Sequence, residues 1–365
     1  MKHILTPLAL IALLFASCSE SAPEETVKSK MTYPETKKQD IVDTLWGQTI
    51  ADPYRWLEDD NSQETKTWVQ SQNKVTQDYL SSISFRKDIE TRYSGLIDYE
   101  KVGSPYKVGE KYFINKNSGL QNQSVIYVRQ GLDGEDQVFL DPNTLSEDGT
   151  VTASLIGASD DNKYMAISRS EAGSDWSEIR VMDIETKQET SDILKWIKFG
   201  GASWYNDGFF YSRYPEPENG TELSGENTFH QVYYHKIGTD QSEDELIYQN
   251  LNAPNMYHWC GVTEDDAYLI LYASTGTDGF EVYFKDLSTE NSDFQPLFTG
   301  FANKSSVVHH VNGRFMVLTD IDAPKYQLVS IDPKNPAKEN WEVIIPESND
   351  LLEGASTGGG KLFAT

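Results

Sequence analysis

The feature that most limits the fold is a recurring unit in which an acidic or glycine-containing turn leads into an aromatic-rich strand. It occurs in "SDDNKYMAIS", "YNDGFFYSR", "TEDDAYLILY" and "VNGRFMVLTD", and each copy precedes a second strand that ends in a polar turn. The copies lie roughly 45–60 residues apart, which is the period of four-stranded β-propeller blades. A two-sheet sandwich also contains many short strands, but it would not repeat in this way. The repeats therefore favour a mainly β, propeller fold over a sandwich.

A helical region precedes the strands. Within residues 62–93, apolar side chains such as Trp68 and Tyr79 recur at helical spacing after a Ser-x-Glu entry. After about Asp98 the sequence changes to short apolar or alternating runs separated by turn residues. We therefore expect a helical N-terminal segment followed by a β domain.

Residues 1–18 have the composition of a secretory signal peptide. Lys2 supplies a positive charge, an apolar run extends over residues 4–15, and small residues precede Cys18. The apolar run is too short to cross a bilayer. The sequence "FASC" that ends at Cys18 resembles a bacterial lipobox, in which the cysteine is lipidated. A plain signal peptide with an incidental cysteine is the alternative.

The polar residues 19–32 are expected to form a disordered tether. Together with the signal peptide, this tether predicts an exported protein of a bacterial envelope. The protein would be periplasmic, or a lipoprotein anchored to a membrane through Cys18.

Charge and cysteine content exclude several other functions. The formal net charge of −26 repels nucleic-acid phosphates and anionic lipids, so no nucleic-acid partner is expected. Cys260 is the only cysteine besides Cys18, which excludes a cysteine-based zinc or iron–sulfur site. The adjacent His309 and His310 would point to opposite faces of a strand. We therefore predict no metal site.

Ser356 lies in Gly-Ala-Ser-Thr-Gly, which fits the G-x-S-x-G pattern of a hydrolase nucleophile. That pattern requires an apolar strand before the serine, a helix after it, and then an acid and a histidine further along the chain. Polar residues precede Ser356, three glycines follow it, and no histidine lies beyond it in this sequence. We therefore reject Ser356 as a catalytic residue.

Three stretches carry a resemblance to a known family: "DPYRWLED" at residues 52–59, "GLQNQ" at 119–123 and "GSDW" at 173–176. With their surroundings they closely resemble the prolyl oligopeptidase family of serine peptidases, from about Tyr33 to the last residue. The resemblance implies an α/β-hydrolase domain that bears Ser, Asp and His. A seven-bladed propeller, inserted near the amino end, would cap that domain.

The resemblance also implies the domain organisation. Residues 33–97 would be the N-terminal segment that packs on the hydrolase domain, where the charged residues of "DPYRWLED" would form ion pairs and caps. Residues 98–365 would be propeller, with about five blades and part of a sixth at roughly 50 residues each. The propeller would then be incomplete, and the catalytic Ser, Asp and His would lie beyond Thr365.

The implied function is that of a serine-type prolyl endopeptidase, which hydrolyses short peptides after proline without a metal or organic cofactor. The propeller would cover the site so that only short peptides enter. Because this sequence lacks the triad, the chain alone is expected to be inactive. The alternative is a non-catalytic, lipid-anchored propeller that binds peptides or glycans.

Phe199 is the one candidate substrate-binding residue. It matches a family position whose aromatic ring faces the active-site cavity, and the alternative is an aromatic side chain packed in a blade core. Met256 and Tyr257 lie near a second such position, but the local sequence departs from the family pattern, so no role is assigned to them.

Overall fold

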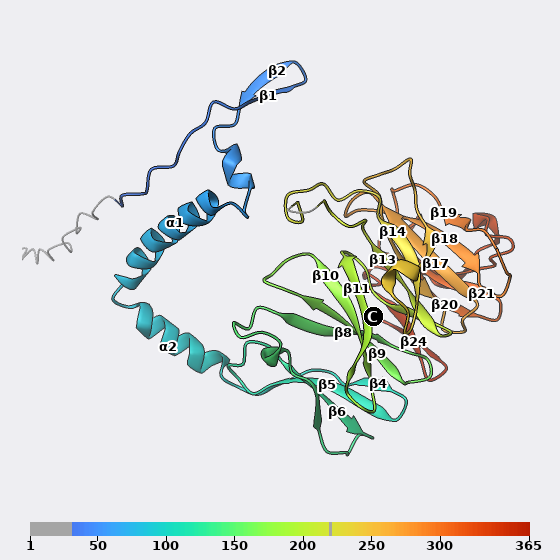
Figure 1. Cartoon of the computed structure of the whole chain (residues 1–365). Helices are drawn as coiled ribbons and strands as arrows, with labels where there is room; N and C mark the ends of the chain where they lie inside the picture. Colours follow the sequence, from blue (N-terminus) through green and yellow to red (C-terminus); the bar gives the residue numbers. More distant parts are fainter. Residues whose placement is uncertain (1–30, 219–220) are drawn as a thin grey trace, which may run out of the picture. The chain divides into compact units, whose positions relative to one another are not determined.

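The computed structural model describes residues 31–218 and 221–365 (Figure 1). The predicted signal peptide of residues 1–18, its Cys18, and residues 19–30 of the predicted tether lie outside the described residues. The chain divides into two compact units, Met1–Arg86 and Lys87–Thr365. The domain bounds inferred from the sequence stay predictions. None of the helices in the described ranges is long and apolar enough to cross a membrane.

The first unit contains a hairpin, a short 3-10 helix and a long helix: β1 Val42–Leu45, β2 Gln48–Ala51, η1 Arg55–Glu58 and α1 Gln63–Ser81. Ser62 caps α1, because its hydroxyl accepts a hydrogen bond from the backbone N–H of Thr65 at 3.1 Å. The Arg55 guanidinium forms an ion pair with Asp52 at 2.6 Å. The cap agrees with the helix entry predicted from the sequence. The role of these charged residues against a hydrolase domain stays a prediction.

Apolar side chains of this unit lie largely at its surface. Among residues 31–86, only Thr65 is buried, and Trp46 at the tip of the hairpin is 97% exposed. This segment therefore holds its helix through caps, ion pairs and the Trp56–Trp68 ring contact, whose centroids are 6.4 Å apart, rather than through a core of its own.

The second unit begins with α2 (Arg86–Ile97, whose first residue closes unit 1) and continues as consecutive antiparallel sheets, coloured turquoise through green to red in Figure 1. Sheet 1 contains β3 Lys101–Val102, β4 Tyr106–Val108, β5 Lys111–Asn117, β6 Val125–Gln130 and β7 Gln137–Leu140. Sheet 2 contains β8 Thr152–Ala158, β9 Tyr164–Ser170, β10 Ser177–Asp183 and β11 Glu189–Ile197. Sheet 3 contains β12 Ser203–Tyr205, β13 Gly208–Arg213, β14 Gln231–Lys236 and β15 Glu245–Tyr248.

Sheet 4 contains β16 Tyr257–Val262, β17 Tyr268–Ser274, β18 Glu281–Asp286 and β19 Gln295–Phe298. Sheet 5 contains β20 Ser305–Val311, β21 Arg314–Thr319, β22 Gln327–Ile331 and β23 Glu342–Ile345. The hairpin of β24 Ala355–Gly358 and β25 Lys361–Ala364 follows. Short 3-10 helices lie in the connections: η2 Pro142–Thr144, η3 Gln241–Glu243 and η4 Lys338–Asn340.

The four repeated aromatic-rich runs of the sequence form the second strand of sheets 2, 3, 4 and 5. Almost every residue of β13 is buried, and so is almost every residue of β17. Both faces of such a strand are covered, because neighbouring sheets contribute to shared cores, as Ile179 of β10 and Phe209 of β13 do. In the described residues of the second unit this gives five sheets of four or five strands and the two-stranded hairpin of β24 and β25. The predicted mainly β, blade-by-blade fold is confirmed.

Candidate functional site

Phe199 lies in the connection between sheets 2 and 3, two residues after the end of β11. Its backbone has a left-handed φ of 53°, and its side chain is 67% exposed. The next residue, Gly200, passes so close to β13 that an added Cβ would lie 2.6 Å from the carbonyl oxygen of Ser212. The ring therefore stands at the surface and does not pack in a blade core. Its contact with substrate stays a prediction.

The Phe199 ring faces Tyr257, the first residue of β16. The ring centroids are 5.4 Å apart at an interplanar angle of 42°. Tyr257 in turn stacks on Trp259, with centroids 5.8 Å apart. The sequence alone assigns Tyr257 no role, because the local sequence departs from the family pattern. The aromatic pair itself joins residues 58 positions apart, so no local motif marks it.

Lys198, the residue before Phe199, lies over Trp176. The Lys198 ammonium is 3.9 Å from the centroid of the Trp176 ring, a cation–π contact, and burial lowers the pKa of Lys198. The indole N–H of Trp176 donates to the carbonyl oxygen of Glu222 at 2.6 Å. Depressions of about 440 Å³ and 390 Å³ share Trp176 as a wall. Trp176 and Trp196 thus line one depression together with the cations Arg169 and Lys195.

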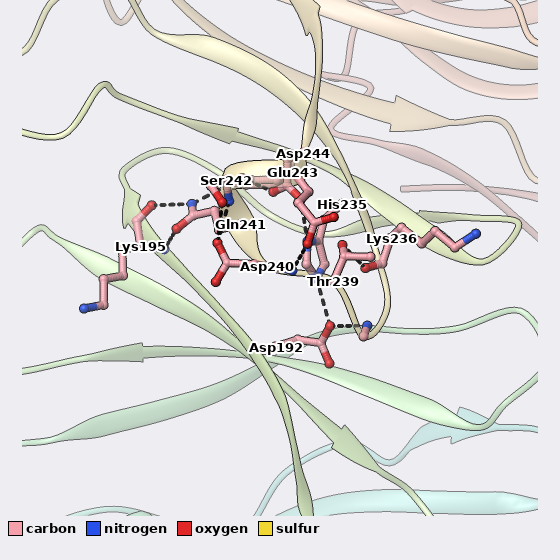
Figure 2. Close-up of polar contacts among 12 residues, drawn as sticks. Asp192, Lys195, His235, Lys236, Thr239, Asp240, Gln241, Ser242, Glu243 and Asp244 are labelled. Carbon is pink, nitrogen blue, oxygen red and sulfur yellow. Dashed lines mark hydrogen bonds and ion pairs between the residues drawn. The ribbon is translucent and has the colours of Figure 1, made fainter.

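A buried network of acids around a histidine lies where sheets 2 and 3 meet (Figure 2). The Nε2 of His235 contacts Asp192 of β11 at 2.9 Å, and its Nδ1 contacts Asp244 at 2.7 Å. The side chains of His235, Asp192 and Asp244 are at most 1% exposed. The Tyr211 hydroxyl donates to the second oxygen of Asp244 at 2.6 Å.

The charges of this network follow from its contacts. Burial alone lowers the pKa of His235, but its hydrogen bonds to Asp192 and Asp244 outweigh burial and raise the pKa to about 9. Burial alone raises the pKa of Asp192, and the hydrogen bond from His235 is the largest of several that hold it below its usual range. Two members of a serine-hydrolase triad are an acid and a histidine, but here both ring nitrogens are occupied and sealed from solvent. The network therefore links two sheets and is not a proton-transfer site.

Ser356 lies in β24, where it pairs with Phe363 of β25. The hairpin turn is made by Gly359 and Gly360, which have φ values of 57° and 71°. The segment is strand, turn and strand, whereas a nucleophile elbow leads from a strand into a helix. Within residues 31–218 and 221–365, no three His, Cys, Asp or Glu side chains gather closely enough to hold a metal ion.

Comparisons with known proteins place this arrangement in a family. Residues 33–365 match the family described as "Prolyl oligopeptidase, N-terminal beta-propeller domain". The chain is 43% identical to a prolyl endopeptidase of Elizabethkingia meningoseptica over 366 residues, which cover 100% of this chain and 51% of that protein. It is 31% identical to prolyl oligopeptidase A of Amanita bisporigera, over 86% of this chain and 46% of that protein.

Solved structures agree with these matches. A prolyl endopeptidase studied for the role of inter-domain dynamics in catalysis superposes with a TM-score of 0.81 at 30% identity, over 91% of this chain and 49% of its own. Prolyl oligopeptidase B of Galerina marginata, bound to a 25-residue macrocyclization substrate, superposes with a TM-score of 0.77 at 26% identity, over 92% of this chain and 51% of its own. The chain spans about half the length of the curated relatives it matches. It therefore belongs to the prolyl oligopeptidase family, with residues 33–365 matching that family's N-terminal β-propeller domain.

Proposed function

We propose that this chain is the propeller part of a serine-type prolyl endopeptidase that hydrolyses short peptides after proline. The observation that carries the proposal is the match of residues 33–365 to the propeller domain. The chain also matches about half the length of prolyl endopeptidase relatives. A hydrolase domain would be its intramolecular partner and would supply the triad. A histidine oriented by a carboxylate would take the proton of the serine, and backbone donors would stabilise the oxyanion.

In this proposal the propeller contributes access control and part of the substrate surface. Phe199 would contact the substrate, since an exposed ring held in a left-handed backbone is a feature of binding surfaces rather than of cores. Alone, the chain would be inactive, because Ser356 lies in a hairpin.

Fusion of this chain to the part of the Elizabethkingia meningoseptica relative that the match does not cover tests the proposal. The fusion should cleave a short reporter peptide after proline and react with a serine-directed fluorophosphonate, and the chain alone should do neither. Cleavage or labelling of the chain alone would disprove its inactivity. If the chain binds peptides or glycans and the fusion stays inert, the non-catalytic binding module replaces the proposal.

The same fusion also tests whether the propeller restricts access to short peptides. The enzyme should cleave a short peptide at least tenfold faster than a long unfolded protein that contains the same site, and Phe199→Ala should raise KM more than it lowers kcat. Equal rates on the short and the long substrate would remove the gating role. A matched control is Phe229→Ala, a partly exposed aromatic that also has a left-handed backbone.

Export and lipid anchoring remain a separate proposal, supported by the composition of residues 1–18. In a bacterial host, an alkyne-labelled fatty acid should be incorporated into the parent chain and not into Cys18→Ser. Export without incorporation would favour a plain signal peptide and a periplasmic location.

A further inference from the structure

The aromatic pair of Phe199 and Tyr257 is built from two separate segments. Phe199 follows the last strand of sheet 2, and Tyr257 opens the first strand of sheet 4. Nothing in either segment alone fixes the 5.4 Å between their ring centroids. A third element must hold both backbones in register.

His230, just before β14 of sheet 3, contacts both backbones. Its Nε2 lies 3.0 Å from the carbonyl oxygen of Lys198, the residue before Phe199. Its Nδ1 accepts a hydrogen bond from the backbone N–H of His258, the residue after Tyr257, at 2.8 Å. A single imidazole therefore reaches a neighbour of each ring.

These contacts fix the tautomer of His230. Because Nδ1 accepts a backbone N–H, it carries no proton, so the proton is on Nε2 and is donated to the Lys198 carbonyl. His258 returns a hydrogen bond from its own Nδ1 to the His230 carbonyl oxygen at 3.0 Å. The two residues are thus locked to each other in both directions.

Other rings and the protein interior enclose His230. Its side chain is fully buried, its ring centroid is 4.3 Å from that of Tyr214, and the His258 ring is stacked at 6.2 Å with an interplanar angle of 11°. Burial, with His258 as the next cause, lowers the pKa of His230 to about 3. The ring is therefore neutral near pH 7.

We propose that His230 is a positioning residue, whose two hydrogen bonds set the placement of the Phe199 ring relative to the Tyr257 ring and so the aromatic surface offered to an apolar residue of a peptide. The proposal deepens the proposed function and rests on it for the identity of the ligand. The ring placement itself does not depend on any ligand.

Placement is tested on the chain itself by the nuclear Overhauser effect (NOE) between the two rings, with ¹³C-labelled Phe and Tyr. The parent should show the NOE, and His230→Phe, which keeps a ring but neither hydrogen bond, should lose most of it. His230→Gln, whose amide can donate and accept, should recover part. Tyr214→Phe is the matched control, because it keeps the ring against His230, and its NOE should equal that of the parent. An undiminished NOE in His230→Phe overturns the proposal.

The hydrogen bonds of His230 can also be measured in the parent chain, so the proposal stays testable if His230→Phe does not fold. In the parent, a ¹⁵N–¹⁵N coupling across the hydrogen bond should join the His258 backbone nitrogen to His230 Nδ1, and Nε2 should carry the proton. A protonated Nδ1, or no coupling between these two nitrogens, overturns the proposal without any substitution.

Titration with an N-acylated Gly-Pro peptide separates this proposal from the proposed function. The peptide should shift the Phe199 and Tyr257 ring signals of the parent and should bind about tenfold more weakly to folded His230→Phe. If the peptide shifts no ring signal in the parent, substrate contact by Phe199 is contradicted. The NOE would still decide whether His230 sets the placement of the two rings. Equal affinity in parent and variant would overturn the role of His230 in recognition.

Discussion

Two junctions between neighbouring sheets use a buried histidine in opposite ways. Between sheets 2 and 3, His235 lies between the carboxylates of Asp192 and Asp244. Between sheets 3 and 4, His230 is bonded to a backbone carbonyl and a backbone N–H and stacks on His258. Burial is nearly complete at both, with His235 1% exposed and His230 0% exposed. What differs is the chemistry of the partners.

The comparison shows that partners, and not burial, decide the charge of an enclosed imidazole. Two carboxylates raise the pKa of His235 to about 9, against the effect of burial. Backbone dipoles provide no net charge, so burial prevails and lowers the pKa of His230 to about 3. The first junction is therefore ionic and the second is neutral, although both link sheets of the same architecture.

The largest effect is expected from removal of the cation at the ionic junction. His235→Leu leaves two buried carboxylates without the cation between them, and we expect the free energy of unfolding to fall by roughly 3–5 kcal/mol. Denaturant unfolding of the chain measures this. The matched control is His309→Leu, which removes an imidazole that is 20% exposed and beside the exposed Glu264, and it should cost less than about 1 kcal/mol. Similar losses of unfolding free energy in both variants would show that the buried network stabilises the fold no more than an exposed ion pair does.

The two histidines should also give opposite pH dependence. The folded-state pKa of His235 lies above its unfolded value, so its contribution is complete below pH 6.5 and is lost as the pH rises through 9. The folded-state pKa of His230 lies below its unfolded value, so its contribution is complete above pH 6.5 and is lost as the pH falls toward 3. Over the full pH range, these changes are roughly 3 kcal/mol for His235 and roughly 5 kcal/mol for His230.

Imidazole titration by NMR measures the two pKa values directly, and denaturant unfolding between pH 6.5 and 9 measures the loss that His235 causes. Asp192→Asn should reduce that loss, because one of the two carboxylates that hold the proton is gone. A stability that rises over this interval, or a His235 that titrates near 6.5, would contradict the ionic junction.

A smaller effect is expected from the edge of the ionic network. Tyr211→Phe removes the hydroxyl that donates to Asp244 at 2.6 Å, and the free energy of unfolding should fall by about 1–2 kcal/mol because a buried carboxylate loses a donor. Tyr106→Phe, at a side chain that is 46% exposed, is the control and should change little. An unchanged stability in Tyr211→Phe would mean that water replaces the hydroxyl.

The smallest effect is expected at a charge that adjoins the network only in sequence. Lys236 follows His235 but is 61% exposed, and its ion pair with Asp207 at 2.7 Å is exposed too. Lys236→Ala should change the free energy of unfolding by no more than about 0.5 kcal/mol. A thermal melt measures this, and a cost above about 1 kcal/mol would show that exposed charge also supports the junction.

Local patterns in the sequence anticipated the strands and the first helix. The aromatic-rich runs "GFFYSR" and "YLILYAS" became β13 and β17, and the serine of the Ser-x-Glu entry became the cap of α1. Such features depend on neighbours within a few residues, so a single sequence displays them. The G-x-S-x-G match at Ser356 likewise failed on local context, since a short hairpin surrounds it.

What the sequence determined alone is therefore the period of the blades, their aromatic second strands and the resemblance to a family. Only the tertiary structure decided which side chains meet: Phe199 with Tyr257, 58 positions apart, His230 with the carbonyl of Lys198, and His235 with Asp192. Each pair spans different sheets, and its geometry is set by how whole blades pack. The charge of a buried histidine depends on its distance from those partners and on its desolvation. Neither quantity can be predicted from the residues next to it in the sequence.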